Sequence, residues 1–554
     1  EPVNWKISLH QTTLRDVDYS MQMLPTIADM QVTLHEAVLA DGAIDLGKST
    51  IDVRMLTLDS ISARYLTPTP EYVAAHPLPE VKEAPDTIPS VPWTIRAQKL
   101  RLTNSRAIYA MEGAAPSEFF DPSYIEATEI NLAVDSFYNR GTEITVPLHL
   151  SAREHCGVKL DLSGTFAMDS AAMYARAFEL KTPTSTLSLD AMMGMDTVNP
   201  PLSALLSAEI SPDDIRRLTP AAAQPIVAGL PQYKPVVLAA DINGRMENLD
   251  IHRLSAEIPG YVALGAEGEI SDYSDINRAR GEVQLHGAIT NGNFIKQTLF
   301  DAKTGKELNI PPLRLTGSAK LRGGTVDGRL RAYTGAGNVA LDAMWNNLRQ
   351  AYNVDLALNE FPIQSILPGL GARDIDADLK VTGQGIDIFS KTMHATADVA
   401  LHHAQYQGRE YRDINLHADV ADGHADINAS STNPGIDFTL KADGNLAGTT
   451  YNWNLDGDVR HVDLRALAMS DTTADGSVKL DGTVSFTPAV AATRRHPSKP
   501  MNVDARINIP SLTWNMPGER ITAADINLRF DAADSATDAT LTNRDLKLTF
   551  AAPV

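Results

Sequence analysis

The chain has 554 residues, of which 43% are apolar and 21% charged, and its formal net charge is −21. This composition is typical of a folded protein and excludes a disordered one, and the length exceeds what one compact core fills. Because each phosphate contact needs a Lys or Arg, the acidic balance argues against a nucleic-acid-binding protein; the strongest basic cluster in the linear sequence is Arg494-Arg495-His496.

Cysteine content and hydropathy bear on location. The single cysteine, Cys156, excludes an intramolecular disulfide, which fits a cytosolic or a bacterial periplasmic protein. No run of 18 or more apolar residues occurs, so we expect no transmembrane helix or signal peptide in these residues. The chain begins without Met and ends in strand-like sequence, so we expect a membrane anchor to lie outside it.

Two weak repeats run through the chain. The strand-like segment around Trp5 and Ile7 recurs around Trp93 and Ile95, at an offset of 88 residues. An acid-Ile-Asn-Leu tetrapeptide begins at Glu129, Asp413 and Asp525. Repeated β units bury their apolar faces against their neighbours, which predicts an elongated, stacked sheet.

The elements expected along the chain are mostly strands. Alternation of apolar and polar residues predicts an antiparallel meander, and four Asp-Gly pairs are expected to form its turns. These pairs begin at Asp41, Asp422, Asp443 and Asp481. In chain order we expect a first β repeat at 1–66, a Pro-rich surface excursion at 67–92, a second β repeat at 93–210, a short helical insert at 211–230 and a continued repetitive β-groove at 231–554.

Few helices are predicted. Ser211 followed by Pro212 and two acids is a strong helix start, because Ser caps the first turn and Pro suits its first position. Further short helices are expected near 293–302, 362–367 and 463–468, where they would cap the sheet. The predicted fold class is therefore all-β: an elongated, repetitive antiparallel sheet curled into a taco-like groove, with a few short capping helices.

A search for chemistry finds no catalytic, cofactor or metal motif. Gly305-Lys306 lacks the rest of a phosphate loop, because the position five before Gly305 is Phe300 and the residue after Lys306 is Glu307. His155 and Cys156 are adjacent, and adjacent residues on a strand point to opposite faces, so they are not expected to pair as base and nucleophile. The histidine-dense stretch from His402 to His424 is interpreted as a solvated strand face. We therefore predict a protein that is not an enzyme and that has no cofactor.

The alternating apolar residues suggest a ligand class. A groove lined by Leu, Val, Ile, Ala and Met suits acyl chains better than sugars or aromatic ligands, which stack on Trp and Tyr, although the same residues could equally pack against one another. The predicted groove-lining residues are Ile375, Ala377, Leu379, Val381, Val478, Leu480, Val484 and Phe486, with Asp376, Asp378, Lys380, Lys479 and Asp481 facing water.

Four features of the chain together suggest a known family. They are the repeated Trp-x-Ile strands, the acid-Ile-Asn-Leu strands, the segment Phe361 to Pro368 and the segment that follows it from Ile375 to Ile388. In these features the chain resembles the AsmA-like superfamily, most closely the translocation and assembly module (TamB) family of Bacteroidetes-type bacteria. The resemblance implies a periplasmic segment of a Gram-negative envelope protein anchored in the inner membrane. It also implies an architecture like that of bridge-like lipid transfer proteins, with phospholipid acyl chains in the groove, and an association with an outer-membrane barrel partner.

Three functions remain open from the sequence. The leading hypothesis is a conduit that carries phospholipid between the inner and outer membranes. The alternatives are an assembly factor for outer-membrane β-barrel proteins, acting by pairing of strand edges, and a repetitive β adhesin.

Overall fold

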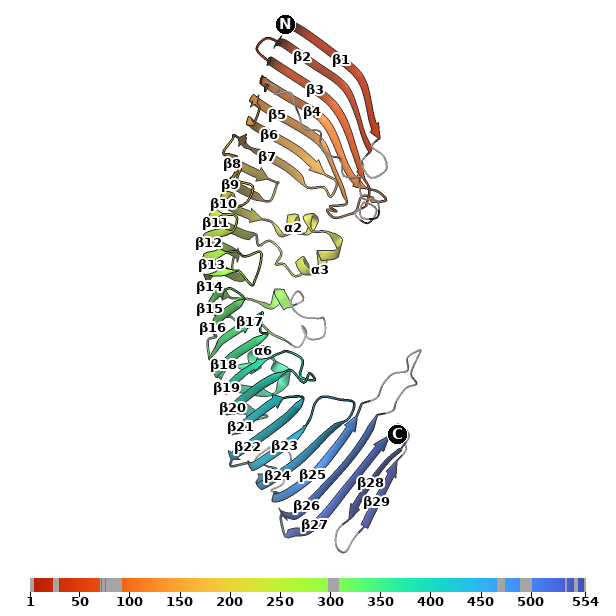
Figure 1. Ribbon diagram of the computed structural model, residues 1–554, viewed down its shortest axis with the longest axis vertical. Helices are drawn as coiled ribbons and strands as arrows, with labels where there is room; N and C mark the ends of the chain where they lie inside the picture. Colours follow the sequence, from red (N-terminus) through yellow and green to blue (C-terminus); the bar gives the residue numbers. More distant parts are fainter. Residues whose placement is uncertain are drawn as a thin grey trace. The chain divides into compact units, whose positions relative to one another are not determined.

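The computed structural model describes residues 4–22, 29–69, 71, 75, 92–296, 308–465, 474–488, 501–533, 536–542 and 547–552. It is 71% strand and 6% helix, which confirms the predicted all-β class with few short helices. The chain divides into two compact units, the first comprising residues 1–271 and 289–305 and the second 272–288 and 306–554. In each unit the sheet is open and curled (Figure 1).

Unit 1 contains strands β1 to β13, in which each strand pairs with the next one in sequence. The first five have 17 or 18 residues, about three times the usual strand length. The bounds are β1 Lys6–Gln22, β2 Asp29–Asp45, β3 Thr50–Thr67, β4 Thr94–Met111, β5 Tyr124–Arg140, β6 Glu143–Glu154, β7 Lys159–Met168, β8 Ala172–Lys181, β9 Thr186–Gly194, β10 Pro201–Ile210, β11 Val236–Arg245, β12 Asn248–Ile258 and β13 Val262–Ser271.

Unit 2 contains β14 to β29, and from β15 onward each strand pairs antiparallel with the next. The bounds are β14 Arg280–Ile289, β15 Leu313–Arg322, β16 Thr325–Tyr333, β17 Asn338–Asn346, β18 Ala351–Phe361, β19 Ala372–Gln384, β20 His394–Tyr406, β21 Arg409–Ala421, β22 His424–Asn433, β23 Ile436–Asn445, β24 Tyr451–Asp463, β25 Asp475–Thr487, β26 Asn502–Met516, β27 Glu519–Ala533, β28 Ala536–Thr542 and β29 Lys547–Ala552.

One strand pair departs from the predicted antiparallel meander. β3 and β4 run parallel, with Ile51 opposite Ile95 and Leu58 opposite Leu102. A tight turn cannot join parallel strands, because the chain must return to the starting end of the sheet before the second strand begins. The long Pro-rich stretch between Thr67 and Thr94 supplies that return, although residues 70, 72–74 and 76–91 lie outside the described part.

The repeated acid-Ile-Asn-Leu tetrapeptide marks a break in the ladder. Its acidic residue has a left-handed backbone at all three sites, with φ of 51° at Glu129, 56° at Asp413 and 53° at Asp525. Two residues on, Asn131 donates from its side chain to the carbonyl oxygen of Glu129 at 2.9 Å, and Asn527 does the same to Asp525 at 3.2 Å. Such irregularities bend a strand and increase its twist, so the repeat encodes curling of the sheet.

The Asp-Gly pairs have two roles. Asp422 and Gly423, with φ of 54° and 74°, form the turn between β21 and β22 as predicted. The pairs at Asp41, Asp443 and Asp481 lie inside strands, so the prediction of turns there is wrong. Gly444 shows the physical reason, because a Cβ at this position would lie 2.5 Å from Trp453 Cδ2 on the neighbouring strand.

The helices are short. They are α2 Pro212–Leu218, η1 Ala221–Ala223, α3 Gln224–Val227, η2 Asn293–Ile295, α6 Ile363–Ile366 and η3 Pro368–Leu370. The insert predicted at 211–230 contains the first three, and Ser211 caps α2 by accepting from the amide of Asp213. The helix predicted at 463–468 does not begin at Asp463, because that residue ends β24. The last three residues of this predicted helix, 466–468, lie outside the described residues. The same is true of residues 297–302 of the helix predicted at 293–302.

A buried carboxylate ties α2 to the sheet of unit 1. Asp214, 7% exposed, accepts hydrogen bonds from the hydroxyls of Thr182, Thr184 and Ser185 in the turn between β8 and β9. Burial alone would raise the pKa of Asp214, but these hydrogen bonds outweigh it and lower the pKa. The carboxylate therefore stays charged and fixes the helix at the strand ends, where Figure 1 shows α2 beside β10.

Candidate functional site

A ladder of aliphatic side chains crosses the sheet of unit 2. Leu379 of β19 lies directly opposite Leu356 of β18 and Val399 of β20. Directly opposite residues of neighbouring strands share a face, so the register can be followed across the sheet. The resulting row, the unit-2 apolar lane, consists of Gly317, Leu330, Leu341, Leu356, Leu379, Val399, Leu416, Ala429, Leu440, Gly457 and Leu480. At about 4.8 Å per strand it runs about 48 Å along the sheet.

The lane joins two of the groove-lining residues predicted from the sequence, Leu379 and Leu480, although β19 and β25 are six strands apart. Their neighbours on the same strands follow the alternation. Ala377 and Val381 flank Leu379, and Val478, Val484 and Phe486 lie on the same side of β25 as Leu480. Ile375 lies opposite Phe361, beyond a shift in register.

The water-facing residues predicted with them lie on the opposite face. Lys380 of β19 connects by direct register to Asp481 of β25. The connecting residues, with Lys380 and Asp481 at the ends, form the unit-2 polar lane: Lys380, Asp398, His417, Asn428, Lys441, Asp456 and Asp481. Lys380, Lys479 and Asp481 are exposed, whereas Asp376 and Asp378 are half-buried.

Large side chains of the unit-2 apolar lane are open to solvent. Leu330, Leu416 and Leu440 retain 36%, 37% and 39% of their full exposure. Isolated exposed leucines are common on proteins, but leucines aligned in one row form a continuous apolar surface. The lane can therefore contact an apolar ligand without the sheet first opening.

Unit 1 carries a corresponding row on one face. Leu102, Leu132 and Leu150 are directly opposite one another on β4, β5 and β6. The unit-1 apolar lane consists of Leu14, Ala37, Leu58, Leu102, Leu132, Leu150, Leu162, Leu180, Leu187, Ala208, Leu238, Ala256 and Leu264. The row passes through the parallel β3–β4 pair without interruption, so the change of strand direction leaves the apolar surface continuous.

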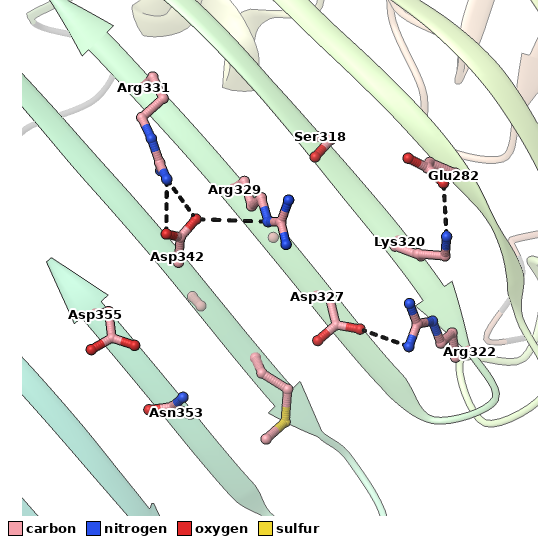
Figure 2. A pocket seen from close by; sticks show the side chains of 13 residues that line it. Glu282, Ser318, Lys320, Arg322, Asp327, Arg329, Arg331, Asp342, Asn353 and Asp355 are labelled. Carbon is pink, nitrogen blue, oxygen red and sulfur yellow. Dashed lines mark hydrogen bonds and ion pairs between the residues drawn. The ribbon is translucent and has the colours of Figure 1, made fainter.

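The polar face of unit 2 contains a depression of about 600 Å³ over β14 to β18, shown in Figure 2. Lys320 donates to Glu282 at 2.9 Å, and Arg331 donates to both carboxylate oxygens of Asp342 at 2.8 and 3.0 Å. The hydrogen bond from Arg331 lowers the pKa of Asp342, and that from Lys320 lowers the pKa of Glu282. These carboxylates are therefore ionised and paired.

The cations of this depression do not stand out as a cluster in the linear sequence. Uncharged or acidic residues separate the four cations along the chain, so no run of basic residues is visible; the cations are Lys320, Arg322, Arg329 and Arg331. Alternation puts them on one face of the hairpin formed by β15 and β16. Counting charges separately for the two alternating faces of each strand would have found them.

Two histidines of the 402–424 stretch, His402 and His417, form close pairs with carboxylates on the polar face. His402 lies 2.9 Å from Asp378, and His417 bridges Asp398 and Asp419 at 2.6 and 2.8 Å. An imidazole that donates from both nitrogens is an imidazolium, and the hydrogen bonds that His417 donates to Asp398 and to Asp419 raise its pKa. Within the described residues no three or more His, Cys, Asp or Glu side chains are arranged so that they could hold a metal ion.

His155 and Cys156 lie in the turn after β6 and not on a strand, so the strand argument used for them is wrong. Both are buried: His155 contacts the carboxylate of Glu154 through Nδ1, and the amide of Cys156 donates to the same carboxylate at 2.7 Å. Burial, with a hydrogen bond to Glu154, raises the pKa of the Cys156 thiol to about 11. The thiol is thus protonated at neutral pH and is a poor nucleophile.

None of the helices in the described part of the chain combines the length and hydropathy that a membrane crossing requires. Comparison of the chain with protein-family models found no match, and neither did comparison with curated proteins or with solved structures.

Proposed function

We propose that the apolar lanes hold the acyl chains of phospholipids, and that the chain is the periplasmic segment of an inner-membrane-anchored envelope protein that carries phospholipid between the inner and outer membranes. The observation that supports the proposal most directly is the unit-2 apolar lane, whose residues are all aliphatic or glycine across eleven strands. The resemblance to the AsmA-like superfamily supports the location. We expect no catalytic step, because transport along a lane needs only apolar contact.

The chemistry of the lane fits an alkyl chain. Burial of each methylene group contributes about 0.8 kcal/mol, so an acyl chain lying along several leucines gains affinity in small, similar increments. Because Leu330, Leu416 and Leu440 repeat at intervals of a few strands, no single contact dominates. A chain bound in this way can slide from one position to the next without crossing a large barrier.

Site-specific photocrosslinking tests the proposal. A photoreactive residue at Leu416 is expected to capture phospholipid from cells, whereas the same residue at the adjacent Asn415 is not, because its side chain lies on the opposite face. Mass spectrometry of the adduct identifies the lipid. Equal capture at both positions, or capture at neither, would contradict binding along the apolar lane.

A charge substitution separates transport from folding. Leu440→Asp places a carboxylate on an open part of the lane, where it stays hydrated, so we expect a cooperative melting transition that is only slightly lowered, and reduced lipid capture at Leu416. Loss of the melting transition in this variant, together with no lipid on the parent protein, would indicate an ordinary packed core.

An assembly factor that pairs with client strands is the second candidate. Within the described residues of unit 1, β1 pairs along one side only, with β2. Leu14 and Tyr19 of β1 are 55% and 49% exposed, and Trp5, directly before the strand, is 69% exposed. A long strand with a free side offers backbone groups for β-augmentation. Crosslinks from β1 to unfolded outer-membrane proteins would favour this function, and crosslinks confined to lipid would exclude it.

A further inference from the structure

The hairpin of β15 and β16 carries all its cationic side chains on one face. Between Leu313 and Tyr333 there are five cations and one carboxylate, a net charge of +4 in a chain of net charge −21. The register places them together, since Ser318 lies opposite Arg329 and Lys320 opposite Asp327. The five cations are Arg314, Lys320, Arg322, Arg329 and Arg331. The other face of the hairpin carries Leu330 of the unit-2 apolar lane, so the cations lie on the opposite side from the proposed lipid path.

Two of the four cations in the depression form only long ion pairs. Arg322 and Arg329 approach carboxylates only at 3.9 Å, from Asp327 and Asp342 respectively, and their side chains are 62% and 76% exposed. By contrast, Arg331 already saturates Asp342 at hydrogen-bond distance. Figure 2 shows Arg329 beside Asp342 and Arg322 at the hairpin end, with Asp327 near it. Both guanidinium groups therefore retain donors for a ligand.

We propose that this depression binds a phosphate group, held by the guanidinium group of Arg329 and the hydroxyl of Ser318, with Arg322, four residues along β15 from Ser318, adding positive charge at the hairpin end. Ser318 and Arg329 are directly opposite, so their Cβ atoms lie about 5 Å apart and both side chains reach one small ligand. Guanidinium groups form paired hydrogen bonds with phosphate oxygens, and a hydroxyl donates to a third oxygen. A phosphate offers enough acceptor oxygens for the two hydrogen bonds from Arg329 and the one from Ser318, whereas a carboxylate offers two.

The charges around the site favour a ligand of limited size. Four acidic side chains line the depression together with the four cations, so the site is locally balanced and a polyanion would meet Asp327 and Asp355 as it extended. The same phosphate chemistry occurs on a small soluble phosphate ester and on a phospholipid headgroup. The experiment distinguishes these two sources.

Calorimetric titration of the whole chain at low ionic strength tests the proposal, because salt screens exposed charges. The ligands are inorganic phosphate, glycerol 3-phosphate and vesicles of phosphatidylglycerol, with acetate at equal ionic strength as the reference anion. We expect Arg329→Gln to weaken phosphate binding about tenfold, the effect of losing one charged hydrogen-bonding group. Arg322→Gln is expected to weaken it less, because Arg322 lies four residues along β15 from Ser318 and acts on the phosphate through its charge.

Arg520→Gln is the matched control. It removes the same unit charge from an exposed position of β27 outside the depression, so any change in overall electrostatics is equal. Binding of the two soluble phosphates that requires Arg329 supports a small phosphate ligand. Vesicle binding that requires Arg329, without binding of soluble phosphate, supports a lipid headgroup.

The proposal is overturned if no ligand binds, if acetate binds as well as phosphate, or if Arg329→Gln and Arg520→Gln weaken binding equally. Melting curves of the variants show whether folding is intact, and Arg322→Gln provides an independent test if Arg329→Gln fails to fold. The result does not depend on acyl-chain binding, since the site and the apolar lane lie on opposite faces.

Discussion

Truncation of Leu440 measures whether the unit-2 apolar lane is open or packed. Leu440 is 39% exposed, so roughly three-fifths of its surface is buried. Full burial of a leucine side chain contributes about 1.5–3 kcal/mol, so Leu440→Ala should lower the free energy of unfolding by only about 1 kcal/mol. No enclosed cavity forms on an open surface, and the additional penalty of a cavity is therefore absent.

Met393 provides the matched control in the same unit. It is 6% exposed, and truncation of a buried methionine to alanine lowers stability by about 2–5 kcal/mol. Urea unfolding followed by tryptophan fluorescence compares Leu440→Ala with Met393→Ala. If Leu440→Ala lowers the free energy of unfolding as much as Met393→Ala, then Leu440 is enclosed by packing and the lane is not available to a ligand.

Three further predictions concern charge and backbone. The pKa of Asp214 is lowered, so this carboxylate contributes to the free energy of unfolding above the pKa that Asp214 has in the unfolded chain, and the contribution is lost as the pH falls below about 4. Asp214→Asn should therefore make the melting temperature less sensitive to acid. The pKa of His417 is raised, so its ion pairs contribute fully to the free energy of unfolding below about pH 6.5, and this contribution is lost at higher pH. His417→Asn should therefore make the melting temperature less dependent on pH between pH 6 and 9. An unchanged pH profile would contradict the bridging role. Ala177 has a left-handed backbone with φ of 50°, so Ala177→Gly should stabilise the protein by about 1 kcal/mol in urea unfolding, and a destabilised variant would refute this.

The fold class could be predicted because strand alternation is a local property of the sequence. The pattern around Leu379 and Leu480 was sufficient to assign both residues to one face, which the register of the intervening strands bears out. The same pattern could not reveal that Gly482 lies within a strand. There a Cβ would approach the carbonyl oxygen of Arg506 to 2.5 Å, and this close approach depends on a neighbouring strand.

The cationic hairpin shows a second limit. Arg329 and Ser318 are eleven positions apart in sequence, and only the register of β15 with β16 places them opposite each other. The ladder breaks at Glu129 and Asp525 were visible as a repeated tetrapeptide, but their meaning was not, because a left-handed residue inside a strand leaves the apolar alternation largely intact. The sequence alone therefore could not predict which residues of neighbouring strands lie opposite one another.

The parallel pairing of β3 with β4 bears on the order in which unit 1 forms. Every other strand pair in this unit joins consecutive, antiparallel strands, so each strand can add to the preceding one as the chain emerges from the ribosome or a translocon. β4 instead has to wait for a connection of 26 residues to close. Since each doubling of loop length adds about 0.6 kcal/mol of closure entropy, this step is disfavoured by roughly 2 kcal/mol relative to a two-residue turn. The strands up to β3 and the strands from β4 onward should therefore form as two separate folding nuclei, and the pairing of β3 with β4 should be the slow step.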